Sequence, residues 1–581
     1  IMEKQKSIFK SENKEKNQAN KKVSSNVKFI ILAVILISLF CFAITPVSLQ
    51  NDTFYSIKIG EHIQNVGIDM QDPFSWHEGL SYTYPHWLYD LLTYWIYAAF
   101  NMDGIYIVTC ILSCILGISI YYVNYKINKN NLISFLLAVG VMYLIKSYVA
   151  ARAQLVTFIL FTWTVYFIER FLQTKKWRYG IFLILISLAI ANLHVAVWPF
   201  FFVLFLPYIG EYIIAALGDT ILYKKISLKI LKLRYNILKK KSAEEKAGKV
   251  LEKINELESR VARIKNVREQ NIKEPYKIKI ERNKNIKFLI LIMIICALMG
   301  LITPTGDTPY TYLYKTMIGN TTQNINEHLP MTLSDQLPIM CTLIIFLAIL
   351  IFTKAKIKLS DLFMLGGLTY LMLTSRRQLT MFAIMGSIVL GRLIVDMFKR
   401  YNTGSEWLLE KLVKPVGMVV LICVMGLFSL NYMEPKIKLK QSYIDETAYP
   451  VKACDYILNE SGIDLSKARF YNEYNYGSYM LFRGIPVFID SRADLYSPEF
   501  NGLDEDIFMD IINTSNIGVF YEDTFEKYGI THVICYKNAK MNMIITKTND
   551  PNYNLLYSDN NFVVYERLSG VEQMEEQNDN Q

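Results

Sequence analysis

The chain has 581 residues, of which 52% are hydrophobic and 20% are charged. Apolar runs near the ~20 residues that cross a bilayer recur along it, which excludes an ordinary soluble protein. The formal net charge is +10, but the basic residues cluster between the apolar runs. That distribution is typical of loops beside anionic lipid head groups and excludes a nucleic-acid-binding protein. The composition therefore predicts a polytopic α-helical protein of the cell membrane.

Residues 1–27 are polar and rich in lysine, which predicts a disordered cytoplasmic tail. No small-residue cleavage site follows the first apolar run, so we expect an uncleaved anchor rather than a signal peptide. From there the apolar runs predict about eleven transmembrane helices. They lie near residues 28–48, 104–124, 131–147, 153–172, 179–194, 196–216, 286–303, 337–354, 360–374, 378–397 and 414–431.

The basic loops set the predicted topology, because every loop expected inside carries Lys or Arg. This assignment requires residues 86–100, a short run rich in Trp and Tyr, to lie in the membrane interface rather than cross it. If they crossed, the basic block 217–285 would be outside. The sequence thus predicts a transmembrane domain, 28–431, with a first outer loop at 49–103 and a cytoplasmic insertion at 217–285. Residues 432–581 are then extracytoplasmic.

Two segments outside the predicted spans have recognisable patterns. In the insertion, apolar residues alternate at spacings of three and four, which favours an amphipathic helical hairpin over a partner-specific coiled coil. In 432–581, the strand-like runs GIPVFID, THVICY and NFVVYER surround helical stretches such as DIFMDIIN, which predicts a small α/β domain. The residues of the hairpin seam are Ala247, Val250, Ile254, Leu257, Val261 and Ile264.

Polar residues that are unusual beside membrane spans fall on one predicted side, the outer face. Ionisable groups at membrane depth are costly, so several of them meeting at one face usually line a cavity and serve function. The residues are Asp52, Asp72, His77, His86, Arg152, Asn192, His194, Glu327, His328, Arg376 and Arg377.

Sugar transfer from a lipid-phosphate donor fits this set of side chains. A carboxylate can take the proton of an acceptor hydroxyl, and arginines and histidines can hold the leaving phosphate. The sequence has no Walker loop and no dinucleotide fingerprint. The candidate catalytic residues are Asp52, Asp72 and His86, and the candidate phosphate-binding residues are Arg152, His194, Arg376 and Arg377.

The first outer loop also carries a resemblance to a known class. It resembles the first outer loop of a group of bacterial proteins assigned to the GT-C class of polyprenyl-phosphate-dependent glycosyltransferases. The resemblance implies a GT-C-like fold, Asp52 as the base, and a lipid phosphate bound between the outer mouths of the spans. It also implies a polyprenyl-phosphate sugar donor and a glycan, lipid or protein acceptor of the cell envelope. The matching residues are Gly60, Gly67, Asp72, Pro73, Phe74, Ser75, His86 and Trp87.

A second run, residues 473–496, is similar to the W-W-D-Y-G region of oligosaccharyltransferase catalytic subunits. Tyr476 and Gly477 match, whereas Glu473, Tyr474 and Asn475 replace the Trp-Trp-Asp portion. In that family the region recognises an acceptor peptide, so the resemblance makes this run a candidate acceptor region. Two further candidates in it are Asp490 and Arg492, although the favoured interpretation is a turn network of Asp490, Arg492 and Asp494 within the outer domain.

Structural roles remain open for most of these residues. Asp52 could cap an interfacial helix, Asp72 could fix the turn before a proline, and Arg152 could reach the lipid head groups. Glu327 and His328 could belong to a solvated loop. No cofactor is certain: Asp52 and Asp72 could share a divalent metal through oxygen ligands, although their spacing fits no metal motif.

Two other functions stay open at this point. A lipid-linked glycan ligase or polymerase also has many spans and an outer region rich in Arg and His. A transporter or flippase of a lipid-linked or polar substrate would be expected to show two similar halves with Gly- or Pro-broken spans, and the sequence shows neither.

Overall fold

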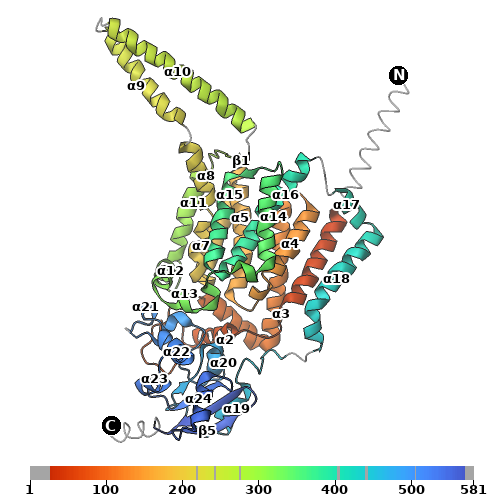
Figure 1. The fold of residues 1–581 in the computed structure, drawn as a ribbon, viewed down its shortest axis with the longest axis vertical. Coiled ribbons are helices and arrows are strands. Elements are labelled where there is room, and N and C mark those ends of the chain that lie inside the picture. The colour runs from red at the N-terminus through yellow and green to blue at the C-terminus, as the bar shows by residue number, and fades with distance from the viewer. Residues whose placement is uncertain are drawn as a thin grey trace.

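The computed structural model describes residues 26–217, 220–240, 244–273, 277–401, 406–438, 442–503 and 505–569. Most of the predicted N-terminal tail, residues 1–25, lies outside these ranges. Figure 1 shows a bundle of helices with a helical hairpin at one end and a region containing a β-sheet at the other.

Helices stand at every predicted span. The bundle consists of Asn26–Ile44, α3 (Trp87–Asn128), α4 (Asn131–Leu144), α5 (Ala153–Thr174), α6 (Trp177–Leu193), α7 (Trp198–Val203), α8 (Leu206–Leu217), α11 (Ile286–Leu298), α14 (Leu337–Phe352), α15 (Leu359–Thr374), α16 (Leu379–Arg400) and α18 (Pro415–Lys438). Short 3₁₀ turns join some of them: η1 (Lys146–Tyr148), η2 (Val195–Val197), η3 (Met299–Leu301) and η6 (Arg376–Gln378).

Within the described residues, 6 helices are long and apolar enough to cross a membrane. They are Asn26–Ile44, Trp87–Asn128, Ala153–Thr174, Val195–Ala216, Arg376–Arg400 and Pro415–Met433. The other helices at predicted spans are shorter apolar helices of 10–17 residues. The chain is therefore a membrane protein, and the count of about eleven spans stays a prediction.

The helix α3 is divided where the sequence predicts a change from an interfacial helix to a span. Asn101 has φ 53° and ψ −151°, which is not a helical conformation, and it separates an N-terminal segment from the longer apolar one. The N-terminal segment, residues 87–100, is the run rich in Trp and Tyr. This break allows the two segments to point in different directions.

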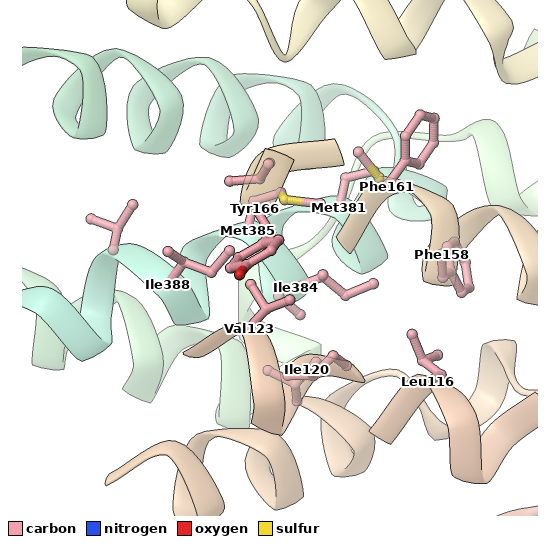
Figure 2. Packing of buried hydrophobic residues seen from close by; sticks show 14 of the residues in the cluster. Leu116, Ile120, Val123, Phe158, Phe161, Tyr166, Met381, Ile384, Met385 and Ile388 are labelled. Atoms are coloured by element: carbon pink, nitrogen blue, oxygen red, sulfur yellow. The ribbon is translucent and has the colours of Figure 1, made fainter. Parts of the chain in front are cut away.

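Tight packing of α3, α5 and α16 forms part of the bundle core. Figure 2 shows Leu116, Ile120 and Val123 of α3 facing side chains of α5 and α16, which include Phe158, Tyr166, Met381 and Ile384. Closely packed interiors do not tolerate large displacements, so this core holds the ends of the three helices in fixed positions relative to one another. Arg152 is the N-cap of α5, and Arg377 lies in the turn η6 that precedes α16.

On the hairpin side, α9 (Thr220–Lys240) and α10 (Glu244–Lys273) form an antiparallel pair. The predicted seam is present, because Val250, Ile254, Leu257 and Val261 pack against apolar residues of α9. The end of the bundle nearest to the hairpin also carries two short strands, β1 (Ile278–Lys279) and β2 (Ile357–Lys358), which pair in parallel.

The other end of the bundle carries short helices and a sheet. Between α11 and α14 lie α12 (Thr308–Ile318), α13 (Thr321–Asn324), η4 (Asn326–His328) and η5 (Leu333–Asp335). At the hairpin end, α17 (Glu406–Leu412) precedes α18 (Figure 1). The C-terminal elements are α19 (Val451–Asn459), β3 (Phe470–Tyr471), α20 (Tyr474–Phe482), η7 (Ala493–Tyr496), α21 (Pro498–Asn501), α22 (Ile507–Asn516), α23 (Tyr521–Tyr528), β4 (His532–Tyr536), α24 (Lys540–Thr548), β5 (Tyr553–Ser558) and β6 (Phe562–Arg567).

The C-terminal sheet has the order β3-β4-β6-β5, with β3 parallel to β4 and the other pairs antiparallel. Two predicted strands, THVICY and NFVVYER, are present as β4 and β6. The prediction for GIPVFID was wrong, because this run joins no strand of the sheet. The side chain of Asn472 takes the place of a neighbouring strand: it accepts a hydrogen bond from the Phe488 amide at 2.8 Å and donates one to the Ile489 carbonyl at 2.7 Å.

The first outer loop packs against both the bundle and the C-terminal region. Its helix α2 (Asn51–Asn65) contacts α3 on one side and α20 on the other. Two hydrophobic clusters contain residues of both the loop and the C-terminal region; one joins Phe54 with Tyr479, and the other joins Tyr82 with Phe488. The loop is therefore a layer between the helices and the sheet (Figure 1).

Candidate active site

A cavity of about 800 Å³ lies where the bundle, the first outer loop and the C-terminal region meet. Its ionisable lining residues come from segments far apart in the sequence. They are Asp52, His86, Arg152, His194, Glu327, His328, Arg377, Arg492 and Asp494, with Tyr55, Tyr82, Tyr312 and Tyr474 among the aromatic ones. Figure 1 shows these segments at the end of the bundle that faces the sheet.

Asp52 and Arg152 form an ion pair in the wall of this cavity. Asp52 stands in the first turn of α2, whose N-cap is Gln50, so Asp52 does not have the capping role that the sequence left open. Arg152 immediately precedes α5, and its Nη1 lies 3.4 Å from Oε1 of Glu327. The guanidinium is thus held between two carboxylates rather than reaching outward to head groups.

Arg376 and Arg377 have different surroundings. Arg376 is absent from the cavity lining; its Nη1 donates to Oδ1 of Asn326 at 2.5 Å and its Nε to the Pro330 carbonyl at 3.3 Å. Arg377 lines the cavity; its carbonyl accepts a hydrogen bond from the Thr380 hydroxyl at 3.1 Å, but its guanidinium forms no ion pair or hydrogen bond with another described residue. Of the neighbours Arg376 and Arg377, Arg377 is therefore the one that an anion in the cavity can reach.

His86 and His194 contribute a pair of rings to the same wall. Their centroids are 4.8 Å apart, and Nδ1 of His194 lies 3.0 Å from Oγ1 of Thr157. Burial lowers the pKa of His86 to about 3, with Arg377 and Arg152 acting in the same direction and Asp52 opposing them. Burial and Arg377 likewise lower the pKa of His328 to about 4. The rings of His86 and His328 are therefore neutral near pH 7, so the positive charge in the cavity comes from the arginines.

Glu327 and His328 have contacts that the solvated-loop interpretation did not include. Both residues line the cavity, and the Glu327 side chain, which is 40% exposed, is a partner of Arg152. The loop is held in place from the bundle: the backbone amide of Arg376 donates to the Leu329 carbonyl at 3.0 Å. The available signal was the presence of two ionisable residues side by side on the predicted outer face.

Asp72, a predicted catalytic residue, does not line the cavity that contains Asp52. Its carboxylate is fully buried and accepts a hydrogen bond from Arg492 at 2.7 Å and one from the Ser75 hydroxyl at 2.6 Å. Arg492 also makes two bonds to Asp490, at 2.9 and 2.6 Å, and its guanidinium stacks over the Tyr82 ring at 4.9 Å. This geometry favours the turn network for Asp490 and Arg492.

Tyr476 and Gly477 lie in the core of the C-terminal region rather than in the cavity. The Tyr476 hydroxyl donates to the Ile534 carbonyl at 2.7 Å, and a Cβ at position 477 would collide with the Ile489 carbonyl. These contacts explain a tyrosine and a glycine at these positions without an acceptor. Their neighbour Tyr474 does line the cavity, with its hydroxyl donating to the Ser491 carbonyl at 3.1 Å.

Asp494 is a further carboxylate of the lining, for which the sequence favoured a turn network with Asp490 and Arg492. It accepts hydrogen bonds from the Tyr312 hydroxyl and, at 3.2 Å, from the Thr321 hydroxyl. Burial raises the pKa of Asp494, and these two hydrogen bonds oppose that shift. Its position near Asp490 in the sequence gave no sign that α12 and α13 would supply its partners.

The residues present do not support a shared metal. The hypothesis required Asp52 and Asp72 to hold one ion, but Asp52 lines the cavity whereas Asp72 is buried against Arg492. In the part of the chain that the structure describes, no group of three or more His, Cys, Asp or Glu side chains is arranged to hold a metal ion.

No protein-family model matches the sequence, and no curated protein matches it. Among solved structures, the apo form of the oligosaccharyltransferase of Archaeoglobus fulgidus matches with a TM-score of 0.50 and 11% sequence identity. The match covers 87% of this chain and 69% of that chain. At this identity the likeness shows a shared fold alone.

Proposed function

We propose that this protein is a membrane glycosyltransferase that moves a sugar from a polyprenyl-phosphate-linked donor to an acceptor outside the cytoplasm. The cavity is the site of transfer, and the C-terminal region forms its outer wall. The observation that carries the proposal is that a carboxylate, Asp52, and two arginines, Arg152 and Arg377, line one cavity at the end of the bundle that faces the sheet.

In the proposed step, the acceptor hydroxyl oxygen attacks the anomeric carbon of the sugar. The carboxylate of Asp52 takes the hydroxyl proton, and the bond between the anomeric carbon and the phosphate oxygen breaks. The phosphate leaves with the bonding electron pair, and the positive side chain of Arg377 stabilises the charge that develops on it. Atoms and charge balance without a further reactant.

Arg152 has a different part in this proposal. Asp52 and Glu327 already hold its guanidinium, so it fixes the direction of the Asp52 carboxylate in the absence of donor. A donor phosphate could compete for Arg152 only by displacing one of these carboxylates. We therefore assign the first contact with the phosphate to Arg377, and to Arg152 a positioning role that can change as the donor enters.

Transfer of a preassembled glycan is the second candidate, and the fold comparison favours it. The matched structure is by its title an oligosaccharyltransferase, whereas nothing in the residues described here limits the donor to one sugar. A donor series that carries one sugar or several on the same polyprenyl phosphate separates the two candidates, because a single-sugar enzyme will lose rate as the glycan grows.

The first prediction tests the proposal at Asp52. Asp52→Asn keeps the size of the side chain but removes its basicity, so release of polyprenyl phosphate from a panel of polyprenyl-phosphate sugars should fall by about 10²–10⁴-fold. The assay uses purified full-length protein with a membrane extract as acceptor. Asp69→Asn is the matched control, because Asp69 is in the same loop but outside the cavity lining.

Thermal unfolding should show that both variants are folded at the temperature of the assay. An Asp52→Asn protein that is folded and still releases polyprenyl phosphate at the original rate would contradict the assignment of Asp52. A chain that releases no polyprenyl phosphate from any sugar of the panel would contradict the proposed donor class.

A further inference from the structure

The hairpin helix α9 has two apolar faces, of which α10 covers one. Leu228, Leu231, Tyr235 and Leu238 of α9 pack with Val250 and Ile254 of α10. These α9 residues recur at spacings of three and four, as expected for one side of a helix. The hairpin interface therefore accounts for this face and leaves the rest of α9 unexplained.

The second apolar face is exposed along most of the helix. Ile226, Ile230, Leu233 and Ile237 are 52%, 60%, 57% and 54% exposed, respectively. Their spacings of four, three and four place them on one stripe, and at 100° per residue this stripe points away from the α10 interface. A single exposed aliphatic residue would need no explanation, but a continuous stripe of them on a helix outside the bundle does.

The charges of α9 have one sign. Thr220–Lys240 contains lysine and arginine but no aspartate or glutamate, whereas α10 contains both basic and acidic residues. Lys229 and Arg234 stand on either side of the aliphatic stripe at helical spacing, and both are exposed. Lys232 points to the other side, where it forms an ion pair with Glu258 of α10 at 2.7 Å.

The position of α9 along the chain brings it close to the membrane. The candidate span Val195–Ala216 ends in α8, and α9 begins at Thr220, so only a few residues separate the apolar helix from the basic one. Figure 1 shows the hairpin leaving the end of the bundle that is opposite to the sheet. A helix with an aliphatic stripe between basic side chains, placed at the end of a span, has the composition of an interfacial membrane helix.

We propose that the exposed face of α9 binds the surface of an anionic bilayer on the side of the membrane opposite to the C-terminal region. The aliphatic stripe enters the boundary between head groups and acyl chains, and Lys229 and Arg234 contact lipid phosphates. The stripe has only isoleucine and leucine, which favours a fluid lipid surface over the aromatic-rich contacts typical of protein interfaces. This binding involves neither Asp52 nor the cavity.

The test places a spin label on α9 in the full-length chain. Ile230→Cys is made where the exposed Cys341 and Cys423 are replaced by serine, and the protein is reconstituted in nanodiscs. One set of discs contains phosphatidylcholine alone, and the other replaces one third of it with phosphatidylglycerol. Leu251→Cys is the matched control, because Leu251 is 40% exposed on α10.

In discs with phosphatidylglycerol, we expect the label at position 230 to be more accessible to oxygen and less accessible to a water-soluble nickel complex than the label at position 251. Replacing Lys229 and Arg234 with glutamine should remove this difference in accessibility between positions 230 and 251. Equal accessibility at both positions would overturn the proposal and leave the face to a protein partner. Burial of the label to the same depth in both lipid compositions would overturn the role of the anionic head groups.

Discussion

At the scale of single residues, Arg376 and Arg377 show how neighbours in the sequence come to differ in function. The short turn η6 that precedes α16 directs one side chain to the loop at 326–330 and the other into the cavity. The sequence predicted that the pair would lie at the mouth of a span, and periodicity could not tell which one faces inward, because a 3₁₀ turn and an α-helix direct successive side chains differently.

The second prediction uses this pair as its own control. Arg377→Gln should weaken the binding of polyprenyl phosphate by about 10- to 100-fold, since a hydrogen bond to a charged group contributes roughly 1.5–3 kcal/mol. Arg376→Gln should leave binding within about twofold, because Arg376 contacts the loop rather than the cavity. The measurement is the quenching of intrinsic fluorescence on titration with polyprenyl phosphate. Equal losses in both variants would contradict the separation of their roles.

At the scale of elements, the close approach of α2 to α3 positions Asp52. A Cβ on Gly60 of α2 would collide with the Asp90 carbonyl and with Cβ of Tyr94, both in the N-terminal segment of α3. Only glycine allows the two helices to lie at this separation. The residue therefore sets the place of α2, and with it the direction from which Asp52 enters the cavity.

The third prediction follows from this contact. Gly60→Ala should lower the free energy of unfolding by about 1–3 kcal/mol, as overpacking of a tight interface usually does, and it should lower the rate of transfer as well. Gly140→Ala in α4 is the control, because nothing lies within 4 Å of a Cβ there. It should be neutral or stabilising, since alanine favours helix formation. Thermal unfolding and the release of polyprenyl phosphate are measured on both variants, and unchanged values for Gly60→Ala would contradict the proposed constraint.

At the scale of the whole molecule, the first outer loop and the C-terminal region behave as one unit. Besides the two shared hydrophobic clusters, Arg492 joins Asp72 of the loop to Asp490 of the C-terminal region. The guanidinium is 3% exposed, and both carboxylates are 0% exposed. A buried charge is tolerated only when it is paired, so this cluster requires both parts of the chain to be in place.

The fourth prediction concerns this cluster. Arg492→Gln would leave two buried carboxylates without a counter-charge and should lower the free energy of unfolding by roughly 3–5 kcal/mol. Arg483→Gln should cost less than about 1 kcal/mol, because Arg483 pairs with the half-exposed Asp455. Thermal unfolding followed by intrinsic fluorescence compares the two variants. Similar midpoints would show that Arg492 does not link the loop to the C-terminal region.

Local and periodic properties could be predicted from the sequence. The apolar runs indicated each helix of the bundle, because crossing a bilayer imposes a length and a composition on every span separately. The hairpin seam and the strands β4 and β6 followed from spacing in the same way. The cavity residues Asp52, His86, Arg152 and His194 were also singled out from the sequence, since ionisable groups are conspicuous beside apolar runs.

Tertiary structure alone decided which of these residues share a cavity and which of them hold the fold together. Asp52 and Asp72 are equally acidic and lie in the same loop, yet one lines the cavity and the other is buried under Arg492. The run GIPVFID has a strand-like composition, but its backbone pairs with the side chain of Asn472 and, at Val487, with the first outer loop rather than with a strand of the sheet. Glu327 lines the cavity from a loop whose Leu329 carbonyl accepts a hydrogen bond from the backbone amide of Arg376. These outcomes depend on contacts between segments tens to hundreds of residues apart, and propensity and spacing carry no information about such contacts.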